Sequence, residues 1–488
     1  MTEIRFVDTT IRDGNQSLWA NNARTKWILP IAKYLDQGGF EAIELSPIDG
    51  RKSVRELKED PWARIRMVSE LITETPLRTV AGRFRPFDVT PDSMYYLYIE
   101  RMFANGIRQT RISEEWNQYE GWKRKVDVSK AVGMQPLINL IFSVSPRHTD
   151  EYYAERARQA LSLDPFRIVL KDPGGLLTPD RMKTIVPAIQ AIVGEKHLEL
   201  HTHCTTGLGP LVALEGIKLG IRTINTGIPP LADGSGNPSV FNVASNARAL
   251  GYTPVFNEEA ARVVSEHFSA VAQREHMPVG KAKEYDAAQF EHQVPGGMIS
   301  NLRHQLKLVG LEHKLEDSLV EATQVRADFG YPVMVTPLSQ FVGSQAAINV
   351  IIGERYKEVT DQTIHYALGR WGGEEAINAM DQNARDKILN RRRAKELQGW
   401  EPPEPTLEEL RSEYGGLGLT DEELLLRFMI GQDEIDIMKA SNTRYDGYPL
   451  RAEQSLVSLV RELTKRTDRN HISVQSGDMS ITLKKSEG

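Results

Sequence analysis

Two histidines and a lysine stand where predicted strands end, and their types suit metal or acid–base chemistry. His201 and His203 lie in the β-rich segment 197–203, and Lys171 directly follows a second such segment, 166–170. Because side chains alternate along a strand, the two imidazoles are expected to point to the same side. A His-x-His pair at a strand end fits metal binding about as well as it fits ordinary satisfied histidines, and a third ligand must come from elsewhere in the chain.

The elements that must position these residues alternate strand and helix over about the first 250 residues. Eight β-rich segments, beginning with 4–8, are each followed by a stretch of helical periodicity. This number and length predict a (β/α)8 TIM barrel, with a doubly wound parallel sheet as the alternative. In a closed barrel the first strand lies beside the last, so Asp13 would reach the same rim as His201 and His203. The three side chains form a mixed oxygen and nitrogen set suited to Zn²⁺, Mn²⁺ or Co²⁺.

After about residue 254 the pattern changes to helices without intervening strands, which predicts an all-helical domain folded over the barrel mouth. The chain then ends in a segment that predicts a short α+β tail, with a helix at 455–465 and strands at 471–475 and 479–484. The expected parts are a TIM barrel at 1–253, a helical domain at 254–445 and a C-terminal tail at 446–488.

Composition excludes several classes of protein. The 488 residues are 40% hydrophobic and 26% charged, with a formal net charge of −6, so no electrostatic argument favours nucleic acid. No uninterrupted run of about 18 apolar residues predicts a membrane span. The single cysteine, Cys204, excludes an internal disulfide, and its strand parity favours a packed thiol over a fourth metal ligand. With no signal peptide before the first strand, we expect a cytoplasmic protein.

Five motifs, in order along the chain, resemble the carboxyltransferase subunits of biotin-dependent carboxylases. They are DTTIRDGNQS (8–17), KDPGGLLTP (171–179), HTHCTTG (201–207), VPGGMISNL (294–302) and MVTPLSQFVGSQAAINVIIGERYK (334–357). The resemblance runs from about residue 4 to 440 and is greatest to the alpha subunit of oxaloacetate decarboxylase, with pyruvate carboxylase and transcarboxylase further off. It implies transfer of a carboxyl group between carboxybiotin and a carbonyl-activated, 2-oxo-acid-like substrate through an enolate, in a direction that the sequence does not encode.

The resemblance also implies a metal centre at the barrel rim. In that family Asp13, His201 and His203 would bind a divalent metal together with Lys171, whose amine would carry CO2 as a carbamate. An unmodified ammonium group cannot be a ligand, whereas a carbamate is an anionic oxygen donor. The metal would then act as a Lewis acid toward the carbonyl of the substrate.

Four further residues receive roles from the resemblance. Gln16 would contact the keto acid. Ser235 stands where the family usually has a threonine that passes a proton between substrate and biotin, so a hydroxyl is retained. Ser339 and Gln340 match positions that line the biotin pocket, although the family often has lysine at the second position.

The sequence departs from the family at the substrate side. After the second strand, SPIDGRKS (46–53) replaces a loop that resembles GGATFD, and Asn15 replaces a histidine. After the third strand, Val80 stands where the family has the first residue of an arginine–glycine pair that grips the keto-acid carboxylate. These departures predict a substrate other than plain pyruvate. Its carboxylate could be bound by one of three nearby arginines, Arg78, Arg83 or Arg85.

No biotin carrier domain is expected within this chain. Met438-Lys439 resembles a biotin-accepting pair but lies in a helical pattern without flanking glycine-rich strands. The resemblance therefore implies biotin supplied in trans by a separate biotin carboxyl carrier protein, a separate biotin carboxylase subunit, and at least a homodimer of this chain. The segment 451–485 is similar to the N-terminal extension of the carrier proteins of acetyl-CoA carboxylase, which makes it a candidate docking element; a surface hairpin that caps the subunit is the alternative.

Three other functions remain open on sequence grounds. A metal-dependent aldol lyase or synthase of the hydroxymethylglutaryl-CoA lyase type shares the first motif and the histidine pair, and would use Asn237 as an additional ligand. A non-catalytic assembly subunit would not need an intact set of metal ligands. A Schiff-base aldolase built on Lys171 would not need the neighbouring histidines.

Overall fold

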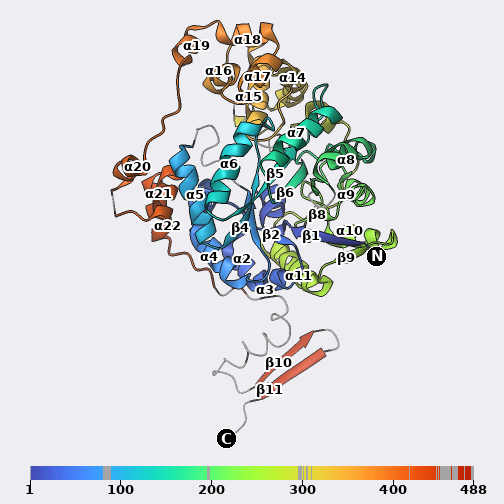
Figure 1. Cartoon of the computed structure of the whole chain (residues 1–488). Helices are drawn as coiled ribbons and strands as arrows, with labels where there is room; N and C mark the ends of the chain where they lie inside the picture. The colour runs from blue at the N-terminus through green and yellow to red at the C-terminus, as the bar shows by residue number, and fades with distance from the viewer. Residues whose placement is uncertain are drawn as a thin grey trace.

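The computed structural model has a parallel β-barrel in its first half, with helices outside and above it (Figure 1). It describes residues 2–80, 90–194, 198–294, 299, 302–303, 306–308, 310–416, 418–446, 448, 450, 463, 471–476 and 479–484. The barrel strands are β1 (Glu3–Asp8), β2 (Ala42–Glu44), β3 (Leu77–Val80), β4 (Ile107–Ile112), β5 (Gln135–Ile141), β6 (Arg167–Asp172), β7 (Leu198–Thr202) and β8 (Thr223–Thr226). They follow one another in sequence order, and β1 pairs with both β8 and β2, which closes the barrel and confirms the predicted fold.

A ninth strand, β9 (Thr253–Val255), pairs in parallel with the beginning of β1. Eight strands were predicted for the barrel region, so this ninth strand was missed. Three residues with a proline among them give no alternating pattern, and proline is tolerated here because β9 lies at the edge of the sheet. The strand ties the end of the barrel to its start.

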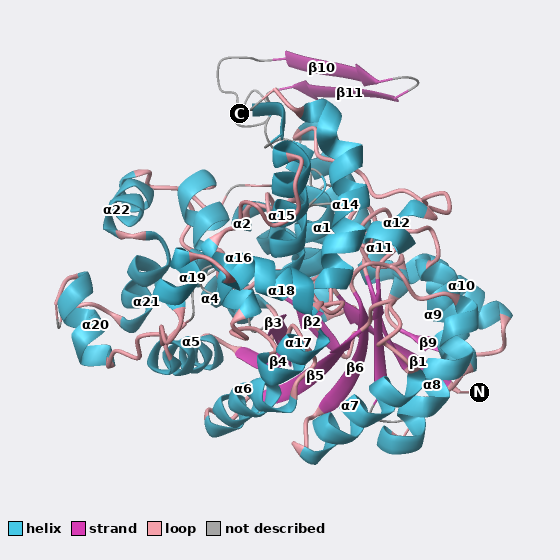
Figure 2. Cartoon of the chain, turned by 90° about the horizontal axis from the view of Figure 1, so that it is seen from above, coloured by secondary structure: helices cyan, strands magenta, loops and turns pink. Residues whose placement is uncertain are grey.

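Helices surround the strands on the outside (Figure 2). They are η1 (Thr10–Gly14), α1 (Asn15–Trp19), α2 (Thr25–Ile28), η2 (Leu29–Ile31), α3 (Ala32–Asp36), η3 (Gly50–Glu56), α4 (Pro61–Leu71), α5 (Asp92–Ala104), α6 (Tyr119–Ala131), α7 (Asp150–Ser162), α8 (Pro179–Val193), α9 (Gly209–Lys218) and α10 (Val240–Ala249). Side-chain caps define the starts of several: Asp60, Thr149 and Thr178 accept hydrogen bonds from the first turns of α4, α7 and α8. These caps fix the residues at which the three helices begin.

The region after the barrel is helical, as predicted. Its elements are α11 (Glu258–Arg274), α12 (Ala288–His292), η5 (Glu312–Lys314), α14 (Leu315–Asp328), α15 (Leu338–Ile352), α16 (Asp361–Ala367), α17 (Gly373–Ala379), α18 (Gln382–Leu389), α19 (Arg392–Leu397), α20 (Leu407–Tyr414), α21 (Asp421–Ile430) and α22 (Gln432–Ala440). Buried apolar side chains form two clusters. One joins the barrel to α11 and α20–α22, and the other joins α14–α19. The boundaries at 253 and 445 stay predictions, and α20–α22 pack with the barrel rather than with α14–α19.

The helical layer is anchored on loops that follow β4 and β5. Trp116 lies in the loop after β4, and its side chain is buried in the α14–α19 cluster. There its ring stacks on that of Tyr366, with 6.3 Å between the ring centroids. The guanidinium of Arg147 lies 4.3 Å from the centre of the Trp116 ring. Glu375 on α17 forms ion pairs with both Arg147 and Arg156. Since both loops come after the carboxyl ends of their strands, the helices cover this side of the barrel mouth.

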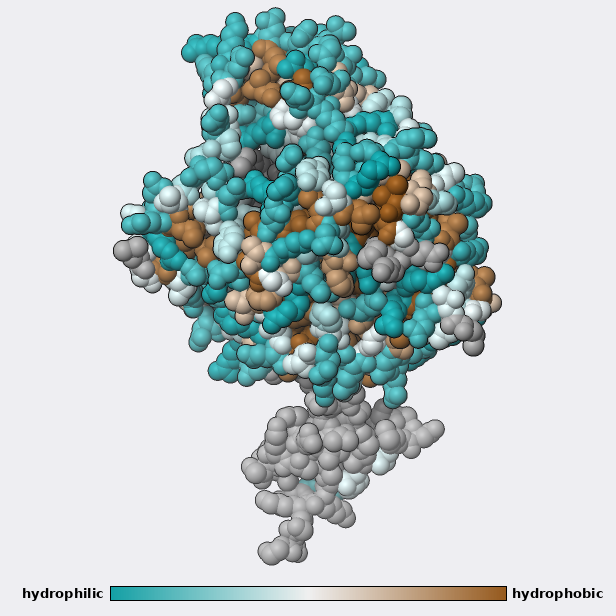
Figure 3. Space-filling model, viewed as in Figure 1, coloured by the Kyte–Doolittle hydropathy of each residue, from teal (hydrophilic) through white to brown (hydrophobic). Residues whose placement is uncertain are grey.

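The tail contains two antiparallel strands, β10 (His471–Ser476) and β11 (Met479–Lys484), which confirms both predicted strands. The helix predicted at 455–465 lies outside the described residues, except for residue 463. Within the described part of the chain, no helix has both the length and the apolar character needed to cross a membrane. The face seen in Figure 3 is mainly hydrophilic, with apolar residues gathered in small patches.

Candidate metal centre

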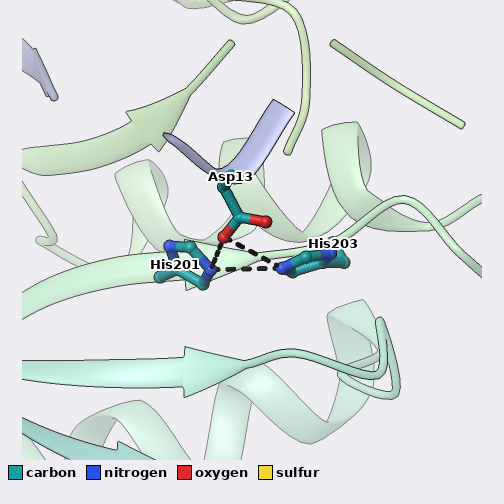
Figure 4. A group of neighbouring side chains, drawn as sticks. All are labelled: Asp13, His201 and His203. Carbon is teal, nitrogen blue, oxygen red and sulfur yellow. Dashed lines mark hydrogen bonds and ion pairs between the residues drawn. The ribbon is translucent and has the colours of Figure 1, made fainter. Parts of the chain in front are cut away.

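The predicted ligands Asp13, His201 and His203 converge at the carboxyl end of the barrel (Figure 4). Asp13 lies on η1, just after β1, and the histidines lie at the end of β7 and just beyond it. Oδ2 of Asp13 is 3.1 Å from Nε2 of His201 and 3.4 Å from Nε2 of His203, and the two Nε2 atoms are 3.2 Å apart. One carboxylate oxygen and two imidazole nitrogens thus face a common point, which fits a divalent transition metal.

Asp13 is held as a carboxylate by its neighbours. Arg12 donates from Nη2 to Oδ2 at 2.6 Å, and the Ser17 hydroxyl donates to Oδ1 at 2.8 Å. Burial alone would raise the pKa of Asp13, but the charges of Arg12 and His203 lower it well below its ordinary value. An anionic oxygen is therefore present at neutral pH, as a metal ligand requires.

The two histidines have different surroundings. Burial and the charge of Arg111 lower the pKa of His201 to about 3, so its ring is neutral at neutral pH. Its Nδ1 lies 2.8 Å from Oδ1 of Asn225 and 3.0 Å from Nη1 of Arg111. For His203, burial opposes charge, but Asp13 and the backbone carbonyl of Ser235, 2.7 Å from Nδ1, raise its pKa above the ordinary value.

Lys171 lies beside this group. It is the register partner of His201 in the parallel pair β6–β7, and neighbours in register point to the same side of a sheet. Its amine donates to the hydroxyl of Ser113 at 3.3 Å, and that hydroxyl also accepts from the Asn139 amide at 2.8 Å. Burial, together with the charges of Arg111 and Arg12, lowers the pKa of Lys171 to about 7. A large fraction of neutral amine is thus present at physiological pH.

A buried ionic network below the ligands was not predicted from sequence. Glu44, fully buried, pairs with Arg12 at 2.8 Å and with Arg111 at 2.6 Å. Burial would raise the pKa of Glu44, but these two arginines lower it to about 2. The sequence signal was a charged residue within or at the end of a strand, such as Arg111 in β4 and Glu44 at the end of β2. Such residues must be paired when they face a barrel interior.

The other predicted site residues lie in different environments. Ser235 is half-buried beside the ligands, and its hydroxyl donates to the carbonyl oxygen of Ser17 at 2.8 Å. Gln16 is exposed on α1, three residues after Asp13. Ser339 and Gln340 lie in the first turn of α15, and Oγ of the former and Oε1 of the latter are buried without a hydrogen-bond partner among the described residues. A buried polar atom without a partner is costly, so these two are candidates for ligand contact.

The proposed carboxylate-binding arginines are only partly accounted for. Arg78 is buried in the barrel, where it pairs with Glu199 at 2.6 Å and donates to Gln109 at 3.0 Å. It is thus committed to the barrel interior. Arg83 and Arg85 lie outside the described residues.

Four residues bear on the alternatives. The oxygen of the Asn237 side chain accepts from the Thr9 hydroxyl at 2.7 Å, and its amide nitrogen is the atom that lies 3.5 Å from Nε2 of His201. An amide binds metal through oxygen, so this orientation does not favour Asn237 as a ligand. Cys204 is buried next to Asp233, with Sγ 3.8 Å from Oδ1, as expected for a packed thiol. Met438-Lys439 lies within the helix α22.

The chain matches two family models that together cover most of its length. Residues 3–267 match the model described as HMGL-like, and residues 290–481 match the conserved carboxylase domain. The barrel, with its Asp-His-His group and covering helices, therefore belongs to the HMGL-like class of barrel enzymes. More narrowly, the chain belongs to the family of carboxyltransferases of biotin-dependent carboxylases.

Curated relatives are similar in the same way. A pyruvate carboxylase subunit of Methanocaldococcus jannaschii is 33% identical over 76% of this chain and 66% of its own length. The methylmalonyl-CoA carboxyltransferase 5S subunit of Propionibacterium freudenreichii subsp. shermanii is 28% identical over 87% of this chain and 85% of its own length. The 2-oxoglutarate carboxylase large subunit of Hydrogenobacter thermophilus is 30% identical over 76% of this chain and 57% of its own length. The matched part of this chain thus covers between 57% and 85% of the length of these relatives.

Among solved structures, the carboxyl transferase domain of Rhizobium etli pyruvate carboxylase superposes with a TM-score of 0.80. The match covers 91% of this chain and 78% of that chain at 20% sequence identity. At this identity the likeness establishes the shared fold: a barrel with its helical extension.

Proposed function

We propose that this enzyme transfers a carboxyl group between carboxybiotin, carried by a separate protein, and a carbonyl-activated, 2-oxo-acid-like substrate. The observation that carries the proposal is the convergence of Asp13, His201 and His203 beside Lys171, whose lowered pKa suits it to bind CO2. The reaction would pass through an enolate of the substrate and could run toward carboxylation or decarboxylation.

In this proposal the metal is bound by Asp13, His201, His203 and a carbamate on Lys171. A Zn²⁺, Mn²⁺ or Co²⁺ ion would supply Lewis-acid charge next to the carbonyl of the substrate. Ser113 supports the carbamate, because its hydroxyl accepts from both Lys171 and Asn139 and keeps its own proton free to donate. Gln16, exposed at the start of α1, would contact the keto acid.

Proton transfer and biotin binding fall to other side chains. The Ser235 hydroxyl lies next to the ligands and would turn from the carbonyl of Ser17 to move the α-proton of the substrate toward the biotin nitrogen. Ser339 and Gln340 would line the biotin pocket, a role supported by their buried, unpartnered oxygen atoms among the described residues. A hydrogen bond from the ligand to each of these oxygen atoms would remove the energetic cost of leaving it unpaired.

The proposed substrate is an acid other than plain pyruvate. Val80 ends β3 where the resemblance calls for an arginine, and Arg78 is paired with Glu199 in the barrel interior. Because Arg78 is committed to this ion pair, it is not free to bind the carboxylate of the substrate. Arg83 or Arg85 stays the proposed contact.

The proposal includes partners. Biotin would come from a biotin carboxyl carrier protein and be carboxylated by a separate biotin carboxylase, since Met438-Lys439 lies on a helix. The M. jannaschii relative is named as a subunit, which supports separate chains. A homodimer or larger assembly, a cytoplasmic location, and docking of the carrier or carboxylase on the tail at 446–488 are further parts of the proposal.

The test uses the purified full-length chain with free biotin and a set of β-carboxylated 2-oxo acids, including oxaloacetate. Metal analysis should show about one divalent ion per chain, and CO2 release should require biotin. Biotin-independent cleavage of hydroxymethylglutaryl-CoA would instead establish a lyase. A metal-free protein without biotin-dependent CO2 release would support a non-catalytic assembly subunit. A borohydride-trapped adduct on Lys171 would support a Schiff-base aldolase.

A further inference from the structure

The ring of His201 has two neighbours that compete for the same nitrogen. Oδ1 of Asn225 lies 2.8 Å from Nδ1, and Nη1 of Arg111 lies 3.0 Å from it. The amide oxygen can only accept a hydrogen bond, whereas the guanidinium can only donate one. A neutral ring can form only one of these two hydrogen bonds. The proton of His201 is therefore either on Nδ1, facing Asn225, or on Nε2, facing Asp13.

The two tautomers differ in their capacity to bind a metal. With the proton on Nδ1, the lone pair of Nε2 points toward Asp13 and His203, 3.1 and 3.2 Å away. With the proton on Nε2, that nitrogen donates to the Asp13 carboxylate and has no lone pair for a metal. The hydrogen bond made by Nδ1 therefore decides whether His201 is ready to act as a ligand.

The orientation of the Asn225 amide is itself fixed by a buried ion pair. Its Nδ2 donates to Oε1 of Glu199 at 2.6 Å, and the same oxygen accepts from Arg78 at 2.6 Å. Turning the amide over would bring its oxygen against the Glu199 carboxylate. Arg78 at 2.6 Å and Arg167 at 3.7 Å both form ion pairs with Glu199, and this arrangement keeps the amide oxygen toward His201.

Loss of the hydrogen bond to Nδ1 of His201 costs Arg111 less than it costs Asn225. Its guanidinium is already paired with Glu44, through Nε at 2.6 Å and Nη2 at 3.0 Å. The Asn225 oxygen, in contrast, takes its hydrogen bond from the His201 ring, and it would face a lone pair at 2.8 Å in the other tautomer. The balance thus favours the proton on Nδ1.

We propose that Asn225, oriented by the Glu199–Arg78 ion pair, is a positioning residue that fixes the Nδ1–H tautomer of His201 and so presents Nε2 to the metal. The metal site belongs to the proposed function, and the tautomer is a property of the metal-free protein. Neither Asn225 nor Glu199 was predicted from sequence to support the site, and Arg78 was a candidate for binding the substrate instead. They connect the middle of the barrel interior to the ligands at its rim.

The experiment follows the tautomer of His201 by long-range ¹H–¹⁵N correlation NMR of metal-free, ¹⁵N-histidine-labelled full-length protein, with the signal assigned through His201→Ala. The unaltered protein should show the Nδ1–H form. In Asn225→Leu, Arg111 should take Nδ1 as its acceptor, and the signal should change to the Nε2–H form. Affinity for Co²⁺, measured by competition with a chelator, should fall about 10- to 100-fold.

Two variants complete the test. Asn225→Asp keeps an acceptor toward Nδ1, with one proton shared between the new carboxylate and Glu199, and should keep the Nδ1–H form and bind Co²⁺ within about threefold of the unaltered protein. Thr110→Val, a buried β4 substitution outside this network, should change neither signal nor affinity. An Nε2–H signal in the unaltered protein, or Nδ1–H retained in Asn225→Leu, would overturn the inference. If no variant binds Co²⁺, the proposed metal site fails, while the NMR result still decides the role of Asn225.

Discussion

Lys171 on β6 and His201 on β7 are register partners in adjacent parallel strands, so both side chains leave the sheet on the same side. Lys171 therefore lies beside the candidate metal ligands, in the barrel interior. Burial first, and then the surrounding arginines, lower the pKa of Lys171 to about 7 and so keep part of the amine uncharged. In the proposed mechanism, this register would place a partly neutral amine where it could react with CO2.

Replacing Lys171 should therefore remove both metal and activity. In Lys171→Ala the carbamate oxygen would be lost as a ligand, and we expect metal affinity to fall at least about tenfold and carboxyl transfer to fall below detection. Metal content by mass spectrometry and turnover with biotin measure the two effects. Lys130→Ala, at an exposed lysine of α6 paired with Asp164, is the control and should change neither. Full activity in Lys171→Ala would exclude the carbamate.

Activation of CO2-depleted protein should depend on pH through Lys171. The lowered pKa means that the amine is protonated below about pH 7 and neutral above it. Only the neutral amine attacks CO2, so at a fixed concentration of dissolved CO2 the activation rate should rise about tenfold per pH unit below 7 and level off above it. The return of activity after adding CO2 and metal gives the rate. A rate that still rises tenfold per unit between pH 8 and 9 would indicate an ordinary lysine.

Much of the fold could be predicted because its signals are local. Apolar strands and stretches of helical periodicity recur along the barrel, and their number predicted the closed architecture. The strand β9 has no such signal, since Thr253–Val255 is defined by its pairing with β1. The packing of α20–α22 with the barrel depends on contacts between segments far apart in sequence, which periodicity does not encode.

The site residues could be predicted only where they lie in a recognisable sequence motif. His201 and His203 share a strand face, and Asp13 follows the first strand, so their meeting follows from barrel closure. Glu44 and Arg111 are charged residues on separate strands, and only the closed interior shows that they are partners at 2.6 Å. The role of such residues depends on which side of the strand is enclosed.

Ser235 should separate chemistry from metal binding. Its hydroxyl lies next to the ligands without being one, so Ser235→Ala should retain metal and lose carboxyl transfer by at least about 100-fold, the size expected for loss of a proton-transfer group. Parallel measurement of metal content and turnover tests this. Ser235→Thr keeps a hydroxyl at the same position and is the matched control, with activity expected within about tenfold of the unaltered protein. An unchanged rate in Ser235→Ala would remove the residue from the mechanism.

The attachment of helices α14–α19 to the barrel should depend on Trp116. This side chain is 1% exposed, packs in the α14–α19 cluster although it comes from a barrel loop, and stacks with Tyr366 and Arg147. Trp116→Ala should cost about 3–5 kcal/mol through the cavity that it leaves. Limited proteolysis should then cut between the barrel and α14–α19 faster than in the unaltered protein, and thermal unfolding should begin at a lower temperature. Trp400→Ala removes a tryptophan that is 42% exposed and should change neither measurement; equal effects from both variants would contradict an anchoring role for Trp116.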